Sequence, residues 1–188
     1  LKYIPVEDGG ATVKAALRCL PDMEYLDMDS CGLSNEEMAS IRDEFPDVEV
    51  VWRVWFGDCY SVRTDVERIL ASKPSVGGML TPENTQALKY CTKVKYLDVG
   101  HNEYLTDVSF LEYMPDLEVC ILAMDWFSDL SPIAGCTKME YLEIQTSYVT
   151  DISALANLTN LEHLNICNLL QTDEMDLSAL YGMTKLER

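Results

Sequence analysis

The fold of this chain is decided by four phrases in its second half: Val94-Lys-Tyr-Leu-Asp-Val99, Leu117-Glu-Val-Cys-Ile-Leu122, Met139-Glu-Tyr-Leu-Glu-Ile144 and Leu161-Glu-His-Leu-Asn-Ile166. Each phrase has apolar residues at its first, fourth and sixth positions, a pattern typical of a short strand with one buried face. The phrases begin 23, 22 and 22 residues apart, and Leu186 follows after a further 25. Such a step indicates a solenoid in which every repeat adds one strand to a stack.

A second motif follows each phrase: an aspartate, an apolar residue and a serine, at 107–109, 129–131, 151–153 and 176–178. Aspartate and serine side chains can accept backbone N–H groups where a chain bends. The segments that begin at these serines are too short for three helical turns. We therefore expect 3-10 turns over residues 109–113, 131–135 and 153–157.

The phrase and its turn together resemble leucine-rich repeats of the 22-residue class, which occur in bacterial internalins and in a regulatory subunit of a eukaryotic protein phosphatase. The resemblance covers residues 94–188 strongly and 21–35 moderately, whereas residues 48–79 depart from it. It implies an α/β fold, a right-handed leucine-rich-repeat solenoid with a concave parallel β-sheet. It also implies a bacterial source, and protein recognition without catalysis.

The first half carries the repeat in a longer form. We expect an N-terminal capping segment with a helix over residues 1–20, and long irregular repeats over residues 21–93. The first positions of the two strand phrases are placed at Met23 and Val48. In this half the convex side is expected to carry true helices, and in the C-terminal half only 3-10 turns.

Two capping signals support those convex helices. Ser34 and Glu37 have the spacing of a capping box, in which each side chain accepts the other residue's backbone N–H. Thr81 suits an N-cap with a proline directly after it, which predicts a second helix over residues 82–90.

The gap of 46 residues between Val48 and the next phrase at Val94 allows two interpretations. The favoured one is an insertion near residues 57–79, with a helix over 64–71 and a loop through 73–78. The other is a degenerate extra repeat, because 46 is about twice the usual step. In either case we expect one domain over residues 1–188, with regular repeats of 22–25 residues from 94 onward.

The candidate binding surface lies between the buried positions of the strands, on the concave side. Its side chains combine aromatic rings, which give large contact areas with few torsions to freeze, with carboxylates that favour a basic partner. The alternative is that the aromatic rings only stack on one another and that the carboxylates only keep the sheet soluble. The candidate residues are Tyr25, Asp27, Trp52, Tyr96, Asp98, Tyr141, Glu143 and His163.

Composition and charge limit the partners. A net charge of −18, from 14 basic and 32 acidic residues, argues against nucleic acid, whose phosphates require Lys and Arg. The sequence has no run of 18 apolar residues, so membrane insertion is not expected. The negative net charge permits a protein or peptide ligand, and a basic one above all.

No cofactor, metal or catalytic site is expected. The two histidines, His101 and His163, fall on different repeats, too far apart to share a zinc ion. Asp27, Asp29 and Asp98 could converge on a cation, but they lack the spacing of calcium loops. A cation-binding or carboxylate-dependent enzyme is therefore the least favoured hypothesis.

The cysteines do not indicate a disulfide framework. Cys91, Cys120 and Cys136 occupy columns that are apolar in the other repeats, and Cys31 occupies a turn position where the family favours Asn or Cys. We expect these four thiols to be buried. Cys59 lies in the irregular region, and we expect it to be exposed.

These observations favour a non-enzymatic module for protein or peptide recognition. The alternative is a structural spacer whose contacts are made by residues 57–79. The chain starts without Met and stops just after Leu186 begins a new repeat, so we expect a piece of a longer protein. We expect that protein to be secreted or at the cell surface, although a cytoplasmic one stays compatible with the sequence.

Overall fold

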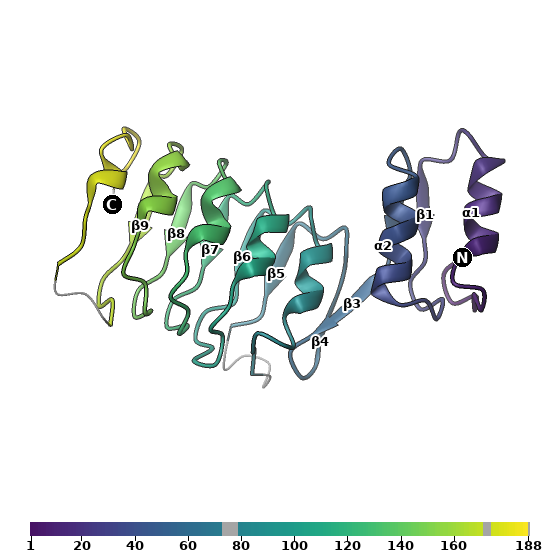
Figure 1. Ribbon diagram of the computed structural model, residues 1–188, viewed down its shortest axis with the longest axis horizontal. Helices are drawn as coiled ribbons and strands as arrows, with labels where there is room; N and C mark the ends of the chain where they lie inside the picture. The colour runs from purple at the N-terminus through teal and green to yellow at the C-terminus, as the bar shows by residue number, and fades with distance from the viewer. Residues whose placement is uncertain (73–78, 171–173, 188) are drawn as a thin grey trace.

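The computed structural model describes residues 1–72, 79–170 and 174–187, which form a row of coils running from the N-terminal to the C-terminal end (Figure 1). The N-terminal elements are α1 (Ala11–Arg18), β1 (Tyr25–Asp27), α2 (Asn35–Glu44), β2 (Glu49–Val51), β3 (Arg53–Phe56), β4 (Tyr60–Arg63) and β5 (Arg68–Leu70). The C-terminal elements are η1 (Gln86–Tyr90), β6 (Tyr96–Asp98), η2 (Ser109–Tyr113), β7 (Val119–Ile121), η3 (Ser131–Gly135), β8 (Tyr141–Glu143), η4 (Ser153–Asn157), β9 (His163–Asn165) and η5 (Ser178–Leu180).

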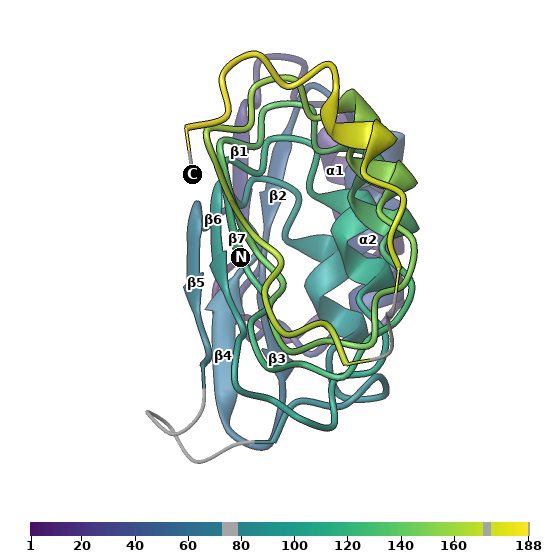
Figure 2. The same cartoon turned by 90° about the vertical axis from the view of Figure 1, so that its left-hand side faces the viewer.

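Strands and helices form two opposite walls of the solenoid (Figure 2). The main sheet has five parallel strands in the order β5-β6-β7-β8-β9, with every strand beside its sequence neighbour. Strands β1 and β2 form a separate parallel pair, and the antiparallel hairpin of β3 and β4 lies between the two sheets in the chain. The predicted stacking of one strand per repeat is confirmed.

The core lies between the two walls. The fourth positions of the phrases, Leu97, Cys120 and Leu142, are wholly buried, because the pleat turns them toward the helices. Leu164, in the last phrase, is partly buried and packs against the same cluster. That cluster extends from Val13 to Met183, so every coil contributes to one continuous core.

The local signals for caps and turns are confirmed. The Ser34 hydroxyl accepts the Glu37 N–H at 3.2 Å, and the Glu37 carboxylate accepts the Ser34 N–H at 2.8 Å, so α2 starts at a complete capping box. The expected 3-10 turns are η2, η3 and η4. Before each of them an aspartate accepts the N–H of the serine two residues later at 2.8 Å.

The helix predicted for residues 82–90 is wrong in type and length, since only the 3-10 helix η1 forms there. Thr81 donates its N–H to Asn84 Oδ1 at 2.8 Å, and the Thr85 hydroxyl donates to the Thr81 carbonyl at 2.8 Å. These side-chain bonds satisfy backbone groups within a turn, and so compete with the helical ladder.

The helix predicted for residues 64–71 is also wrong. Strand β5 lies there and pairs in parallel with β6, so that Ile69 stands opposite Leu97. Val66, Ile69 and Ala71 thus take the first, fourth and sixth positions of a degenerate repeat, and Ile69 and Ala71 are buried. The β3–β4 hairpin comes before this repeat, while the loop expected at 73–78 lies outside the described residues.

The position of the second strand in its repeat differs by one residue from the sequence expectation. Tyr25 pairs with Glu49 and Leu26 with Val50, so the residue equivalent to Met23 is Asp47 and not Val48. A shift of one residue turns every side chain of a strand to the other face. Trp52 consequently points into the core, where it is 0% exposed. The prediction that it is a ligand-facing anchor is therefore wrong.

The cysteines lie as expected. Cys31, Cys91, Cys120 and Cys136 are buried, and Cys59 is exposed. Burial raises the pKa of Cys136 to about 11, because a thiolate loses its hydration there.

Candidate functional site

Five of the eight predicted binding residues share one face of the main sheet. Tyr96 stands opposite Val119, which stands opposite Tyr141, so the two tyrosines point to the same side two strands apart. This face, the one turned away from the helices, is called the sheet face below. The third positions of its phrases are Arg68, Tyr96, Val119, Tyr141 and His163, and the fifth positions are Leu70, Asp98, Ile121, Glu143 and Asn165.

Tyr141, Glu143 and His163 form a cluster at the C-terminal end of the sheet face. The Tyr141 and His163 rings stack with centroids 4.1 Å apart and an angle of 4° between their planes. The Tyr141 hydroxyl donates to Glu143 Oε1, which lies 3.8 Å from His163 Nε2. These contacts hold both rings in place, so a ligand would meet a flat surface that is already arranged.

Tyr96 is held by Arg68 of the neighbouring strand β5. The Arg68 guanidinium lies 4.1 Å from the centre of the Tyr96 ring. The planar cation covers a face of the aromatic ring, an arrangement that is electrostatically favourable. Arg68 is absent from the predicted binding residues, because the pattern of residues 64–71 was interpreted as a helix. The spacing of Val66, Ile69 and Ala71, which matches the first, fourth and sixth positions of a phrase, could have identified it.

Between the two tyrosines the sheet face is apolar. Strand β7 presents Val119 and Ile121, both half-buried, with no charge between them. Beside them Gly100 lies close to the Ala123 backbone, and a Cβ at this glycine would come within 3.0 Å of the Ala123 carbonyl oxygen. The surface therefore has an apolar strip, one strand wide, with a tyrosine ring on either side.

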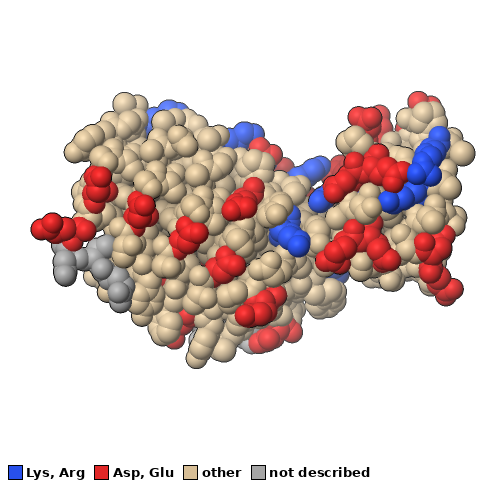
Figure 3. Space-filling view, in the orientation of Figure 1, with Lys and Arg blue, Asp and Glu red and all other residues tan. Residues whose placement is uncertain are grey.

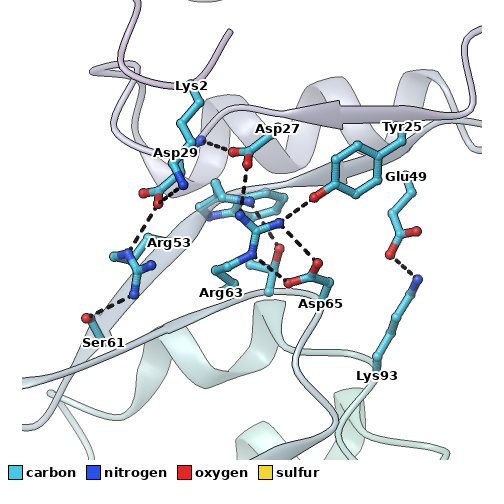
Figure 4. A network of polar contacts seen from close by, with 12 residues as sticks. Lys2, Tyr25, Asp27, Asp29, Glu49, Arg53, Ser61, Arg63, Asp65 and Lys93 are labelled. Atoms are coloured by element: carbon cyan, nitrogen blue, oxygen red, sulfur yellow. Dashed lines mark hydrogen bonds and ion pairs between the residues drawn. The ribbon is translucent and has the colours of Figure 1, made fainter.

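The two N-terminal candidates, Tyr25 and Asp27, do not join this surface. They lie on β1, in the separate pair of strands, and Arg63 of β4 binds both of them (Figure 4). Arg63 Nη1 lies 2.9 Å from Asp27 Oδ2, and the same guanidinium donates to the Tyr25 hydroxyl and to both oxygens of Asp65. The hairpin thus already occupies the part of β1 that was predicted to meet a ligand.

A second arginine of the hairpin binds the neighbouring carboxylate. Arg53 Nε lies 3.3 Å from Asp29 Oδ2, and Lys2 approaches the same oxygen at 3.9 Å. Burial acts to raise the pKa of Asp27, but the Asp29 N–H and the Arg63 guanidinium outweigh it, and the net pKa lies below its ordinary value. Asp27 is therefore an anion, and both carboxylates already contact the protein's own cations.

Replacement of Arg63 by methionine should destabilise the protein by about 1–3 kcal/mol at pH 7, because it leaves the Asp27 and Asp65 carboxylates without their shared cation. Because the pKa of Asp27 is lowered in the folded state, its contribution is present above the unfolded value and lost as the pH falls through the folded value. Urea unfolding should accordingly show a smaller difference at about pH 3.

Arg18→Met is the matched control, since this arginine is largely exposed in its ion pair with Glu44. Its loss should cost less than about 1 kcal/mol. Equal effects of the two variants would show that the hairpin arginine is an ordinary surface cation.

No group of three or more His, Cys, Asp or Glu side chains in the described ranges is arranged to hold a metal ion. Asp98, the third residue of the suggested cation site, lies on β6, in a different sheet from Asp27. The described part of the chain contains no helix with the length and apolar character needed to cross a membrane.

The solved structures to which this chain is similar include internalins and another leucine-rich-repeat protein. An internalin of Listeria monocytogenes, InlF, is 25% identical over 68% of this chain and 36% of its own, with a TM-score of 0.57. Internalin C2 of the same bacterium is 22% identical over 64% of this chain and 59% of its own, with a TM-score of 0.51. A leucine-rich-repeat protein of Leptospira interrogans is 19% identical over 58% of this chain and 28% of its own, with a TM-score of 0.50.

The matched region thus spans little more than a third of the InlF chain, and less than two thirds of the other two. No protein-family model matches the chain, and the comparison with curated proteins gives no match. The similarities agree with the observed architecture: parallel strands on one wall, with helices and 3-10 turns on the other.

Proposed function

We propose that this chain, an internalin-like leucine-rich-repeat protein, is a recognition module that binds a protein or peptide on its sheet face. The observation that carries the proposal is the pair of fixed tyrosines, Tyr96 and Tyr141, on either side of the apolar strand β7. Stacked repeats of this kind build extended open surfaces suited to macromolecular ligands.

The dimensions of the strip suit one apolar side chain of a ligand. Strands β6 and β8 lie two spacings apart, about 10 Å at ~4.8 Å per strand. Val119 and Ile121 form the floor between the rings. Because Arg68 and His163 already hold the tyrosines, binding would freeze few torsions, and less of the contact energy would be spent on ordering.

The charges around the strip favour a basic ligand. Asp98 and Glu143 flank it on the fifth positions, and the margin carries Glu118, Glu140 and Glu162 at the second positions of three successive phrases. Carboxylates in this arrangement raise the rate of encounter with a positive partner. We infer a ligand segment with an apolar side chain flanked by Lys or Arg.

A secreted or cell-surface parent protein remains part of this proposal. The spacer hypothesis has less support, because β4 and β5 of residues 57–79 make contacts within the molecule through Arg63 and the pairing with β6.

Replacement of Tyr96 and Tyr141 together by alanine should weaken ligand binding by more than about tenfold, because the loss of each ring removes a preorganised aromatic contact. The ligand would be selected from a displayed peptide library on the wild-type chain. Its dissociation constant would then be measured by isothermal titration calorimetry for both proteins.

Tyr181→Ala is the matched control, because this tyrosine is 87% exposed and lies at the last coil, away from the strip. Both variants should unfold cooperatively, as the replaced rings are outside the core. If the double variant bound every selected peptide with unchanged affinity, the sheet face would not be the recognition surface.

A further inference from the structure

The loops that follow strands β6 to β9 form a second surface, separate from the sheet face. They comprise residues 100–108, 123–130, 145–152 and 167–170, and are called the loop edge below. His101, Met124, Thr146 and Asn168 occupy the same position in each loop, and all have φ between 54° and 64°. The first three donate their N–H groups to the next loop at 2.7–3.1 Å, so equivalent side chains of successive coils are aligned.

The loop edge exposes large apolar side chains, although its first three loops also bury apolar residues. Leu105, Phe127 and Val149 are 0% exposed and fasten the loops to the core. In contrast, four large side chains of the first, second and fourth loops are exposed. The half-buried Tyr148 of the third loop stands edge-on to one of them, Trp126, with centroids 6.0 Å apart at 88°. The four are Tyr104 at 52%, Met124 at 39%, Trp126 at 40% and Leu170 at 44%. Exposed apolar residues on successive coils mark an interaction surface more often than singly scattered ones do.

The charge of the loop edge has one sign. Residues 100–110, 123–131 and 145–153 contain no Lys and no Arg. Three residues after Tyr104, Trp126 and Tyr148, each loop has an aspartate: Asp107, Asp129 and Asp151. Figure 3 shows acidic side chains in a row across these coils, and basic ones only along the opposite edge and near the junction with the N-terminal coils.

Asp129 and Asp151 stay ionised at neutral pH. Each accepts the N–H of the serine two residues on, and this bond lowers the pKa of Asp129 and of Asp151 below the ordinary value. A row of aromatic and apolar side chains therefore runs beside a row of fixed negative charges.

We propose that the loop edge binds a basic polypeptide segment laid across the coils. Its Lys or Arg head groups would pair with Asp107, Asp129 and Asp151, and its side-chain stems would pack on Tyr104 and Trp126, where a cation over an aromatic ring is also favourable. Four coils at ~4.8 Å span about 14 Å, the length of four or five extended residues.

Charge selects this occupant over the others. Nucleic acid and anionic lipid surfaces carry negative charge, and a second copy of this chain would bring a further −18. This site is independent of the sheet face, and either one could exist without the other.

The three tryptophans provide the test, because their indole N–H resonances report on different places. Trp126 lies on the loop edge, Trp55 is 66% exposed on β3, and Trp52 is buried. The probe is a ten-residue peptide of alternating Arg and Ser, titrated into the ¹⁵N-labelled chain. The proposal expects a saturable shift of the Trp126 resonance alone. It is overturned if Trp126 does not respond, or if Trp55 responds equally, which would indicate unspecific attraction to a negative protein.

Charge variants separate local pairing from net charge. Asp107→Asn, Asp129→Asn and Asp151→Asn together keep the acceptor for each serine N–H and remove three charges. The matched control is Glu7→Gln, Asp22→Asn and Asp47→Asn, which removes three exposed charges from the N-terminal coils, away from both proposed surfaces. Because three exposed ion pairs are lost together, the first variant should bind a fluorescein-labelled form of the peptide about tenfold more weakly, and the control less than about threefold more weakly. Equal weakening by both variants would overturn the proposal.

Discussion

Replacement of Asp125 by asparagine should stabilise this protein by up to about 4 kcal/mol at pH 7, which is the largest single stabilisation that the structure suggests. Asp125 is 0% exposed, and its Oδ2 has no hydrogen-bond partner among the described residues. Burial raises the pKa of this carboxyl from 3.8 to about 9, and the nearby Asp98 adds to the shift. The folded protein therefore has to keep a proton on a group that the unfolded chain releases.

The preceding coil shows what an amide does at this position. Asn102 holds the equivalent place, and its Nδ2 donates to the Val99 carbonyl at 2.6 Å and to the Gly100 carbonyl at 3.2 Å. Asp125 cannot donate in this way, because it has no amide group. Its Oδ1 accepts the Asn102 N–H at 2.8 Å. An asparagine at 125 would retain that acceptor and gain donors for the corresponding carbonyls of its own loop.

The effect should depend on pH in a defined direction. Below the unfolded pKa of about 3.8, the carboxyl holds its proton in both the folded and the unfolded state, so its protonation does not change the free energy of unfolding. As the pH rises from there to about 9, the unfolded chain loses the proton first, so the wild-type stability falls relative to the variant. The advantage of Asp125→Asn should accordingly be small at about pH 4 and largest near pH 9.

Urea unfolding followed by circular dichroism at about pH 4, 7 and 9 would measure this difference. Asp129→Asn is the control, since that carboxylate is exposed and its pKa is lowered rather than raised. A variant less stable than the wild type at pH 9 would show that Asp125 is ionised and paired in the fold, and not a buried neutral acid.

Replacement of Trp52 by alanine should destabilise the protein by about 3–5 kcal/mol, the usual cost of emptying a large core position. Its indole N–H donates to Asn35 Oδ1 at 2.9 Å, its ring lies 5.7 Å from that of Tyr90, and Arg42 covers it at 5.2 Å. These contacts connect α2 and η1 to the residue between β2 and β3, so the loss should affect the N-terminal coils together.

Two further variants make this prediction discriminating. Trp52→Phe keeps most of the ring but loses the bond to Asn35, and should cost about 1–2 kcal/mol. Trp55→Ala removes a neighbouring indole that is 66% exposed, and should change the stability by less than about 0.5 kcal/mol. Urea unfolding measures all three. Unchanged stability in Trp52→Ala would restore this residue to the ligand-facing side of the strand.

Much of the fold follows from the sequence because its signals are local. The step of 22–25 residues places β6 to β9, since each phrase buries its own apolar positions wherever its neighbour lies. The capping box of α2 and the aspartates before η2, η3 and η4 act over two or three residues, and all form as expected.

The candidate site was predicted only in its C-terminal part. The shared face of Tyr96, Asp98, Tyr141, Glu143 and His163 follows from regular repeats in register. The side of the strand on which Trp52 lies, the strand β5 and the role of Arg68 did not follow. The residues in and around β2 are mostly apolar, so the sequence does not show which alternate set of side chains faces the core. These apolar residues are Val48, Val50, Val51 and Trp52.

Read alone, the sequence determined the coils, their turns and the acidic, aromatic character of their surface, because these depend on residues close together in the chain. The tertiary structure decided which of those surfaces is open. Arg63 reaches Asp27 across 36 residues and occupies the β1 side chains, while β5 completes the sheet beside Tyr96. Such pairings depend on contacts between coils that are distant in sequence, and no local pattern of residues specifies them.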